Sequence, residues 1–164
     1  MSTGLALFTL FHVALSLLGI VAGFVVVYGL LTAKPLDRST ALFLSTTVLT
    51  SVTGFLFPFH KFLPSHVLGI ISLVLLPIAI YARYRRKLAG AWNPTYSVTA
   101  VLALYLNFFV LIVQLFEKVP VLHALAPTQT EQPFKFVQLV VLVLFVLITI
   151  FSAIRFRHVQ LRTA

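Results

Sequence analysis

The sequence contains no cysteine and very few acidic side chains. Among its 164 residues are 3 Asp or Glu and 12 Lys or Arg, and charged residues make up 9% of the chain. The lack of cysteine excludes disulfide bonds, thiolate metal sites, iron–sulfur clusters and cysteine nucleophiles. The chain also lacks a G-x-S-x-G elbow, a phosphate-binding loop and a pair of carboxylates close in sequence. We therefore expect a protein without enzymatic activity.

Long apolar runs dominate what is present. Hydrophobic residues make up 60% of the chain, which excludes a water-soluble globular domain. Five runs approach the roughly 20 residues that a helix needs to cross a hydrocarbon core of about 30 Å. We expect an all-α polytopic membrane protein, a single domain built as a bundle of five transmembrane helices. The helices are predicted at 5–31, 41–60, 65–84, 94–117 and 135–156, with residues 118–133 forming a segment at the outer interface.

The basic residues predict the orientation of this bundle. With five crossings, the loops at 32–40 and 82–94 and the C-terminal tail share one side of the membrane. Positive charge in short loops marks the cytoplasmic side, so the N-terminus is predicted outside and the C-terminus in the cytoplasm. We interpret this charge as a topology signal that also contacts anionic lipid headgroups, and predict no nucleic-acid partner. Nine basic residues lie on that side: Lys34, Arg38, Arg83, Arg85, Arg86, Lys87, Arg155, Arg157 and Arg162.

Small and polar residues predict which helix faces pack together. In the first helix, His12, Ser16, Gly19 and Gly23 share one narrow stripe, and small residues let a second backbone approach closely. In the second helix, hydroxyl side chains from Thr46 to Thr53 gather on one side. That side is predicted to pack against protein, with a water-lined or substrate-lined path as the alternative. We expect the second helix near the centre of the bundle and the fifth at its edge.

Two further polar features concern the fourth helix. Asn107 is predicted near mid-membrane, level with Thr50 and Ser51, whose hydroxyls are candidate partners for its amide. At the inner interface, four aromatic residues are predicted to lie at the level of the lipid headgroups. They are Tyr81, Tyr84, Trp92 and Tyr96. Asn93 and Pro94 are predicted to cap and open this helix.

Two stretches resemble a set of small bacterial membrane proteins with no assigned function. They are LYLNFFVLIVQLFEKVPVLHALAPTQTEQPF at 104–134 and SHVLGIISLVLLPIAIYARY at 65–84. The resemblance covers most of the chain from the second helix onward. It implies a multi-pass protein of the bacterial cytoplasmic (inner) membrane with the same helices, and it provides no active residues to transfer.

Most of the imidazole side chains are predicted on the outer side of the membrane. Imidazole and carboxylate ligands bind zinc, copper or iron, and two imidazoles can bind haem. One hypothesis is therefore an outer pocket for haem, a metal ion or a quinone headgroup, with His12 and His66 as the first pair of ligands. The spacing of His60 and His66 matches no known metal motif. The further candidates for this pocket are His60, His123, Gln114 and Glu117.

The leading hypothesis needs no bound cofactor. A small non-enzymatic membrane protein acts as an accessory or interaction subunit, embedded in the lipid bilayer and in contact with other membrane-protein subunits or with copies of itself. The apolar helices and the lack of catalytic motifs favour this interpretation.

Overall fold

A computed structural model describes residues 3–57 and 64–159 of the chain, and this part is folded into helices. The long helices are α1 (Thr3–Leu31), α2 (Asp37–Gly54), α3 (Pro64–Ile80), α4 (Trp92–Lys118) and α6 (Gln132–Phe156). A π-helical turn, η1 (Tyr81–Arg85), continues α3, and a short helix, α5 (Pro120–Leu125), lies in the segment predicted at the outer interface. The first turn of α2 begins before the predicted start at residue 41, and the described helix ends before residue 60.

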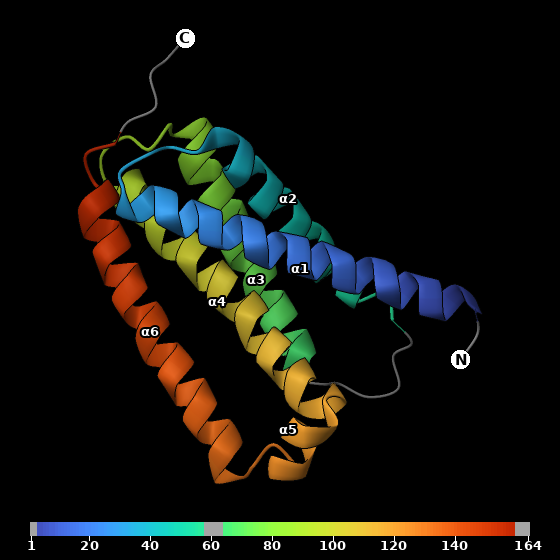
Figure 1. Cartoon of the computed structure of the whole chain (residues 1–164). Helices are drawn as coiled ribbons and strands as arrows, with labels where there is room; N and C mark the ends of the chain where they lie inside the picture. The colour runs from blue at the N-terminus through green and yellow to red at the C-terminus, as the bar shows by residue number, and fades with distance from the viewer. Residues whose placement is uncertain (1–2, 58–63, 160–164) are drawn as a thin grey trace.

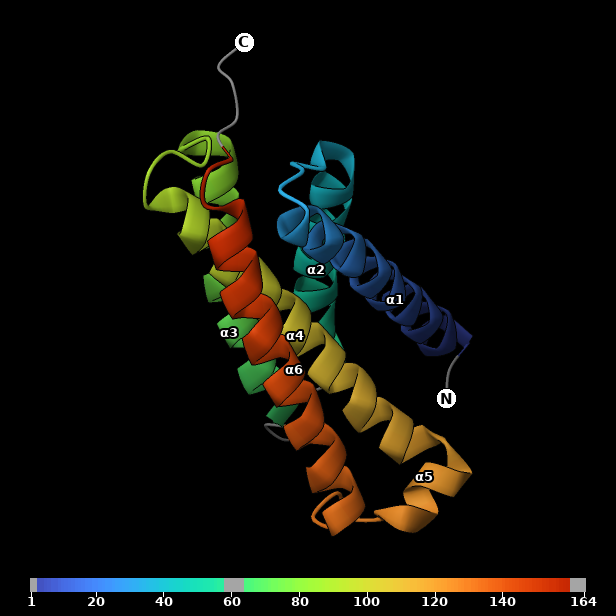
Figure 2. The ribbon, with the colours of Figure 1, turned by 60° about the vertical axis from the view of Figure 1, so that its left-hand side comes forward.

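The chain runs back and forth through the bundle, as Figure 1 shows. The loop between α1 and α2, the loop between η1 and α4, and the end of α6 lie at one end of the molecule, and α5 lies at the other. Turned by 60° in Figure 2, α1 and α2 form one pair and α3, α4 and α6 form a second group. We call the end with the two loops the arginine-rich end, because Arg38 in the first turn of α2, Arg85 at the end of η1 and Arg157 directly after α6 adjoin it.

The central helix is α4, and the prediction that the second helix is central was wrong. α4 packs against α1, α3, α5 and α6, whereas α2 packs mainly against α1 and α3. The fifth long helix, α6, lies at the edge as predicted. Of its most apolar stretch 17% is buried, against 33% for α1 and for α4. Its remaining surface is suited to lipid, because apolar side chains cover it.

Four of the described helices are long and apolar enough to cross a membrane: Thr3–Leu31, His66–Arg85, Trp92–Lys118 and Gln132–Phe156. The five predicted crossings are therefore not confirmed. α2 does not qualify by composition, because its 18 residues begin with Asp37 and Arg38 and include eight Ser or Thr. At 1.5 Å per residue, the 29 residues of α1 extend about 43 Å, so α1 exceeds the hydrocarbon core unless it is tilted.

The packing faces of α1 and α2 confirm the predicted pattern. Gly19 and Gly23 are both buried, and the face of α2 that carries Thr46, Thr47, Thr50 and Thr53 is buried as well. On the opposite face, Leu49, Val52 and Leu56 are exposed. The glycines bring α1 within van der Waals distance of two neighbouring helices, since Phe43 of α2 and Leu104 of α4 both lie beside Gly23.

A proline interrupts the hydrogen bonding of α3 shortly before its π-helical end. Pro77 has no N–H to donate to the carbonyl of Leu73, which loosens the helix at this point. Four residues after Pro77, at Tyr81, the backbone adopts the wider π-helical turn. Such turns change the direction of the side chains that follow, and here Arg83 is directed into the bundle, where its side chain is 1% exposed.

Candidate functional site

His12, the first of the predicted site residues, forms a hydrogen bond between α1 and α2. Its Nδ1 lies 2.8 Å from the hydroxyl oxygen of Thr53. The single proton of that hydroxyl is donated to a backbone carbonyl, Leu49 at 2.7 Å or Thr50 at 3.2 Å, so the oxygen accepts from His12. In the neutral ring, Nδ1 therefore carries the hydrogen and Nε2 is the acceptor nitrogen. This is the arrangement that histidine ligands adopt when the second nitrogen binds a metal or a ligand.

The surroundings of His12 are aromatic and partly open. The ring of Phe57 lies edge-on to the imidazole with 5.1 Å between the ring centroids, and the ring of Phe8 lies 4.9 Å from the ring of Phe57. A side chain at Gly54 would meet Cε1 of His12 at 3.7 Å. His12 itself is partly buried, so part of its side chain stays accessible.

The other predicted site residues are spread over several elements. His66, at the start of α3, has its ring 5.7 Å from that of Phe55, the residue that follows α2. Gln114 donates to Glu117 at 3.3 Å, and Glu117 also pairs with Lys118 at 3.3 Å. His123 is exposed on α5.

These positions do not bring three candidate ligands together. His60 lies outside the described residues. Within the described residues, no group of three or more His, Asp or Glu side chains is close enough to hold a metal ion. His12 contacts Thr53 in the last turn of α2, and His66 contacts Phe55, the residue after α2.

A second polar region lies deeper, where α1, α2 and α4 meet. A methyl group at Gly19 would lie 3.1 Å from the hydroxyl of Thr46, 3.4 Å from that of Thr47 and 3.5 Å from the amide nitrogen of Asn107. Asn107 is therefore close to Thr46 and Thr47, one turn of α2 away from the predicted Thr50 and Ser51. Among the described side chains, the hydroxyls of Thr47 and Thr50 and the amide nitrogen of Asn107 are buried without a hydrogen-bond partner.

A third polar region, at the arginine-rich end, was missed by the sequence analysis. Arg83 forms an ion pair with Asp37 in the first turn of α2 and stacks on the ring of Tyr96, 5.2 Å from its centroid. The hydroxyl of Tyr96 donates to Thr40 at 3.4 Å. Tyr96 is 0% exposed, so its predicted place among the lipid headgroups was wrong.

Asn93 belongs to the same end and also differs from its predicted role. The residue at the cap position of α4 is Ala91, and the side-chain amide of Asn93 donates to the carbonyl of Val159 after α6. Asn93 is 1% exposed. It therefore connects the ends of α4 and α6, a contact between residues 66 positions apart that no local pattern indicates.

Hydrogen bonds also fix the outer segment to the bundle. Gln129 donates to the carbonyl of Val113 at 3.1 Å, and Gln138 donates to that of Phe109 at 3.4 Å.

Within the outer segment, the carboxylate of Glu131 accepts from the hydroxyl of Thr128 at 2.8 Å and from the amide of Thr130 at 3.0 Å. Desolvation raises the pKa of Glu131, but these hydrogen bonds outweigh it, so the pKa lies below its ordinary value of 4.5.

No protein-family model matches the chain, and neither a curated protein nor a solved structure shows significant similarity to it. The resemblance to small bacterial membrane proteins stays a prediction.

Proposed function

We propose that this chain is a non-enzymatic accessory or interaction subunit of a membrane, and that it crosses the bilayer five times. The polar side chains that connect the helices of the bundle support this proposal. Arg83, Tyr96 and His12 each contact α2 from another element, and Gln138 of α6 contacts α4. Contacts of this kind hold transmembrane helices together.

The fifth proposed crossing is α2. Its threonine face is buried against the bundle, and its apolar face is exposed, as expected for a helix between protein and lipid. In Figure 1 it returns from the arginine-rich end alongside α1. By the charge rule, we propose that the arginine-rich end is cytoplasmic and that the N-terminus lies outside, in a bacterial inner membrane.

The single observation that supports an interaction role best is the low burial of α1 before Gly19. Every buried residue of α1 lies between Gly19 and Leu30. The preceding part contacts the described chain through Thr53 and Phe57, while Leu7 and Leu10 are 64% and 67% exposed. In the membrane, exposed side chains such as Leu7 and Leu10 can pack against a helix of another subunit or of a second copy.

Site-specific photo-crosslinking in the native membrane tests this proposal. A photoreactive amino acid is placed at Leu10, with Phe136 at the start of α6 as the control, because both side chains are 67% exposed. We expect a protein adduct of one defined mass from position 10 and none from position 136, identified after purification by mass analysis. Lipid adducts alone at both positions would contradict an interaction role for α1.

The alternative is a haem, metal or quinone site on the outer side, and the orientation of His12 supports it. Thr53 accepts from Nδ1, which leaves Nε2 to bind a ligand. If this alternative holds, the purified protein absorbs as a haem or quinone complex. The band is then lost in His12→Ala and kept in Thr53→Ser, which retains the hydroxyl. A spectrum without such a band, together with no metal found by elemental analysis of the same protein purified out of its native membrane, would contradict this alternative.

A further inference from the structure

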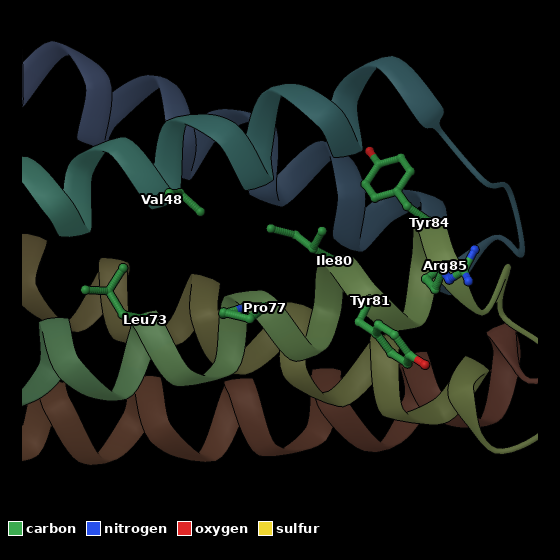
Figure 3. Close-up of a pocket in the computed structure, with 7 residues that line it drawn as sticks. All are labelled: Val48, Leu73, Pro77, Ile80, Tyr81, Tyr84 and Arg85. Carbon is green, nitrogen blue, oxygen red and sulfur yellow. The ribbon is translucent and has the colours of Figure 1, made fainter.

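A groove runs along the outer surface of the bundle between α2 and α3 towards the arginine-rich end. Its volume is about 550 Å³, and its walls are formed by Val48, Leu73, Pro77, Ile80, Tyr81, Tyr84 and Arg85. Figure 3 shows Val48 on α2 facing Leu73, Pro77 and Ile80 on α3, with both tyrosines and Arg85 at one end. A second hollow of about 460 Å³ continues it over Ala41, Ser45 and Leu49, and shares Val48, Ile80 and Tyr84 with the first.

The groove has the length of one membrane leaflet. From Leu73 to Arg85 the chain rises about 18 Å at 1.5 Å per residue, and half of a hydrocarbon core of about 30 Å is about 15 Å. Its walls from Leu73 to Ile80 are aliphatic, which suits an acyl chain. The end nearer Arg85 carries Tyr81 and Tyr84, and amphipathic rings of this kind prefer the level of the lipid headgroups.

Positive charge flanks the headgroup end of the groove on both sides. Arg85 lines it from η1, and Arg38 precedes Ala41, Ser45 and Val48 at helical spacing on α2. In the described part of the chain, the acid nearest in sequence to Arg38 is Asp37, and Asp37 is paired with the buried Arg83. No ion pair among the described residues involves Arg85. An exposed guanidinium without an acidic partner suits a phosphate, which it can bind through two parallel hydrogen bonds.

We propose that this groove binds one anionic glycerophospholipid, with an acyl chain between α2 and α3 and the headgroup phosphate on Arg85. The ion pair between Arg83 and Asp37 contributes indirectly to binding of the anionic headgroup. It neutralises the acid at the start of α2 and keeps Arg83 inside the bundle, so the net charge that faces the headgroup is positive. The lipid then joins α2 to α3, filling a space that protein side chains leave open.

The only tryptophan of the chain reports on this groove. The ring of Trp92 lies 5.1 Å from that of Tyr81, which lines the headgroup end of the groove, so bromine atoms near the headgroup end of a bound acyl chain quench its fluorescence. The full chain is reconstituted in phosphatidylcholine vesicles that contain increasing amounts of brominated phosphatidylglycerol. The measurement is repeated in phosphatidylglycerol vesicles that contain increasing amounts of brominated phosphatidylcholine. The ratio of the two quenching curves gives the relative binding constant of the anionic lipid.

We expect phosphatidylglycerol to bind roughly 25-fold more tightly than phosphatidylcholine, because Arg85 and Arg38 each contribute a factor of about 5, which corresponds to about 1 kcal/mol per cation near the surface. Arg85→Gln should lower this ratio about 5-fold. Val48→Phe, which fills both hollows, should reduce quenching by either lipid. The control Arg155→Gln removes the same charge from the last turn of α6 and should leave the ratio unchanged.

Two results would overturn the proposal. Equal quenching by both lipids in the unmodified chain would exclude selective binding. An equal effect of Arg85→Gln and Arg155→Gln would show that the whole positive surface attracts the anionic lipid, without a site in this groove.

Discussion

Replacing Asp37 by alanine should lower the free energy of unfolding by about 3 kcal/mol, although the carboxylate itself is mostly exposed. The side chain of Asp37 is 73% exposed, but its partner Arg83 is 1% exposed. Removing the acid leaves a buried guanidinium without a counter-charge. Breaking a buried pair costs about 3–5 kcal/mol, and the low end applies here because water reaches the side of the aspartate.

Replacing the partner, Arg83, should lower the free energy of unfolding much less. Arg83→Met removes the buried charge and keeps an apolar side chain of similar length next to Tyr96, so the exposed carboxylate of Asp37 is simply solvated. We expect a loss of about 1 kcal/mol or less, because well-packed apolar residues often replace a buried ion pair at little cost. In the double variant, Asp37→Ala should add almost nothing to Arg83→Met.

Unfolding of the purified chain in mixed micelles, followed by circular dichroism, measures these differences. The matched control is Glu117→Ala, which breaks the exposed pair with Lys118 and should cost less than 1 kcal/mol. Equal losses for Asp37→Ala and Glu117→Ala would contradict the role assigned to the buried guanidinium. So would a larger loss for Arg83→Met than for Asp37→Ala.

Replacing Gly23 by alanine should cost about 1–3 kcal/mol, the usual effect of overpacking a filled core. The added methyl group would lie 2.5 Å from a methyl carbon of Leu104 and 3.0 Å from the ring of Phe43. These two side chains are 0% and 1% exposed, so neither can move aside freely. Gly23→Val should cost more, because it moves α1 away from both neighbouring helices.

The same helix provides the control. At Gly4 an added methyl group meets nothing within 4 Å, so Gly4→Ala should leave stability unchanged or raise it by up to about 1 kcal/mol, the difference in helix propensity. Both alanine variants are measured by the same micelle unfolding experiment. Equal stabilities for Gly4→Ala and Gly23→Ala would contradict the close packing of α1 on α2 and α4.

The faces of the first two helices could be predicted because they follow from local spacing. Gly19 and Gly23 are four residues apart, and the threonines of α2 recur at helical periods, so both buried faces can be derived from a period of 3.6 residues. The central position of α4 could not be derived in this way. When most helices are apolar on every side, composition does not distinguish the face towards lipid from the face towards protein.

The ion pair at the arginine-rich end could not be predicted from local spacing either. Arg83 lies within a run of basic residues that is typical of a cytoplasmic loop, and its partner Asp37 is 46 positions away. The π-helical turn rotates Arg83 inward and leaves Arg85 on the surface. One signal was present: Asp37 is the only aspartate of the chain, and an acid next to a predicted membrane helix needs a partner.

Labelling of single cysteines tests the five proposed crossings most directly, because the natural chain has no cysteine to remove. The positions are Thr3 at the start of α1, Gln129 after α5, Lys87 after η1 and Arg157 after α6. With a maleimide that does not cross membranes, we expect Thr3→Cys and Gln129→Cys to react in intact cells, and Lys87→Cys and Arg157→Cys to react only after permeabilisation. Reaction of Thr3→Cys and Arg157→Cys from the same side would mean an even number of crossings and would contradict the proposed topology.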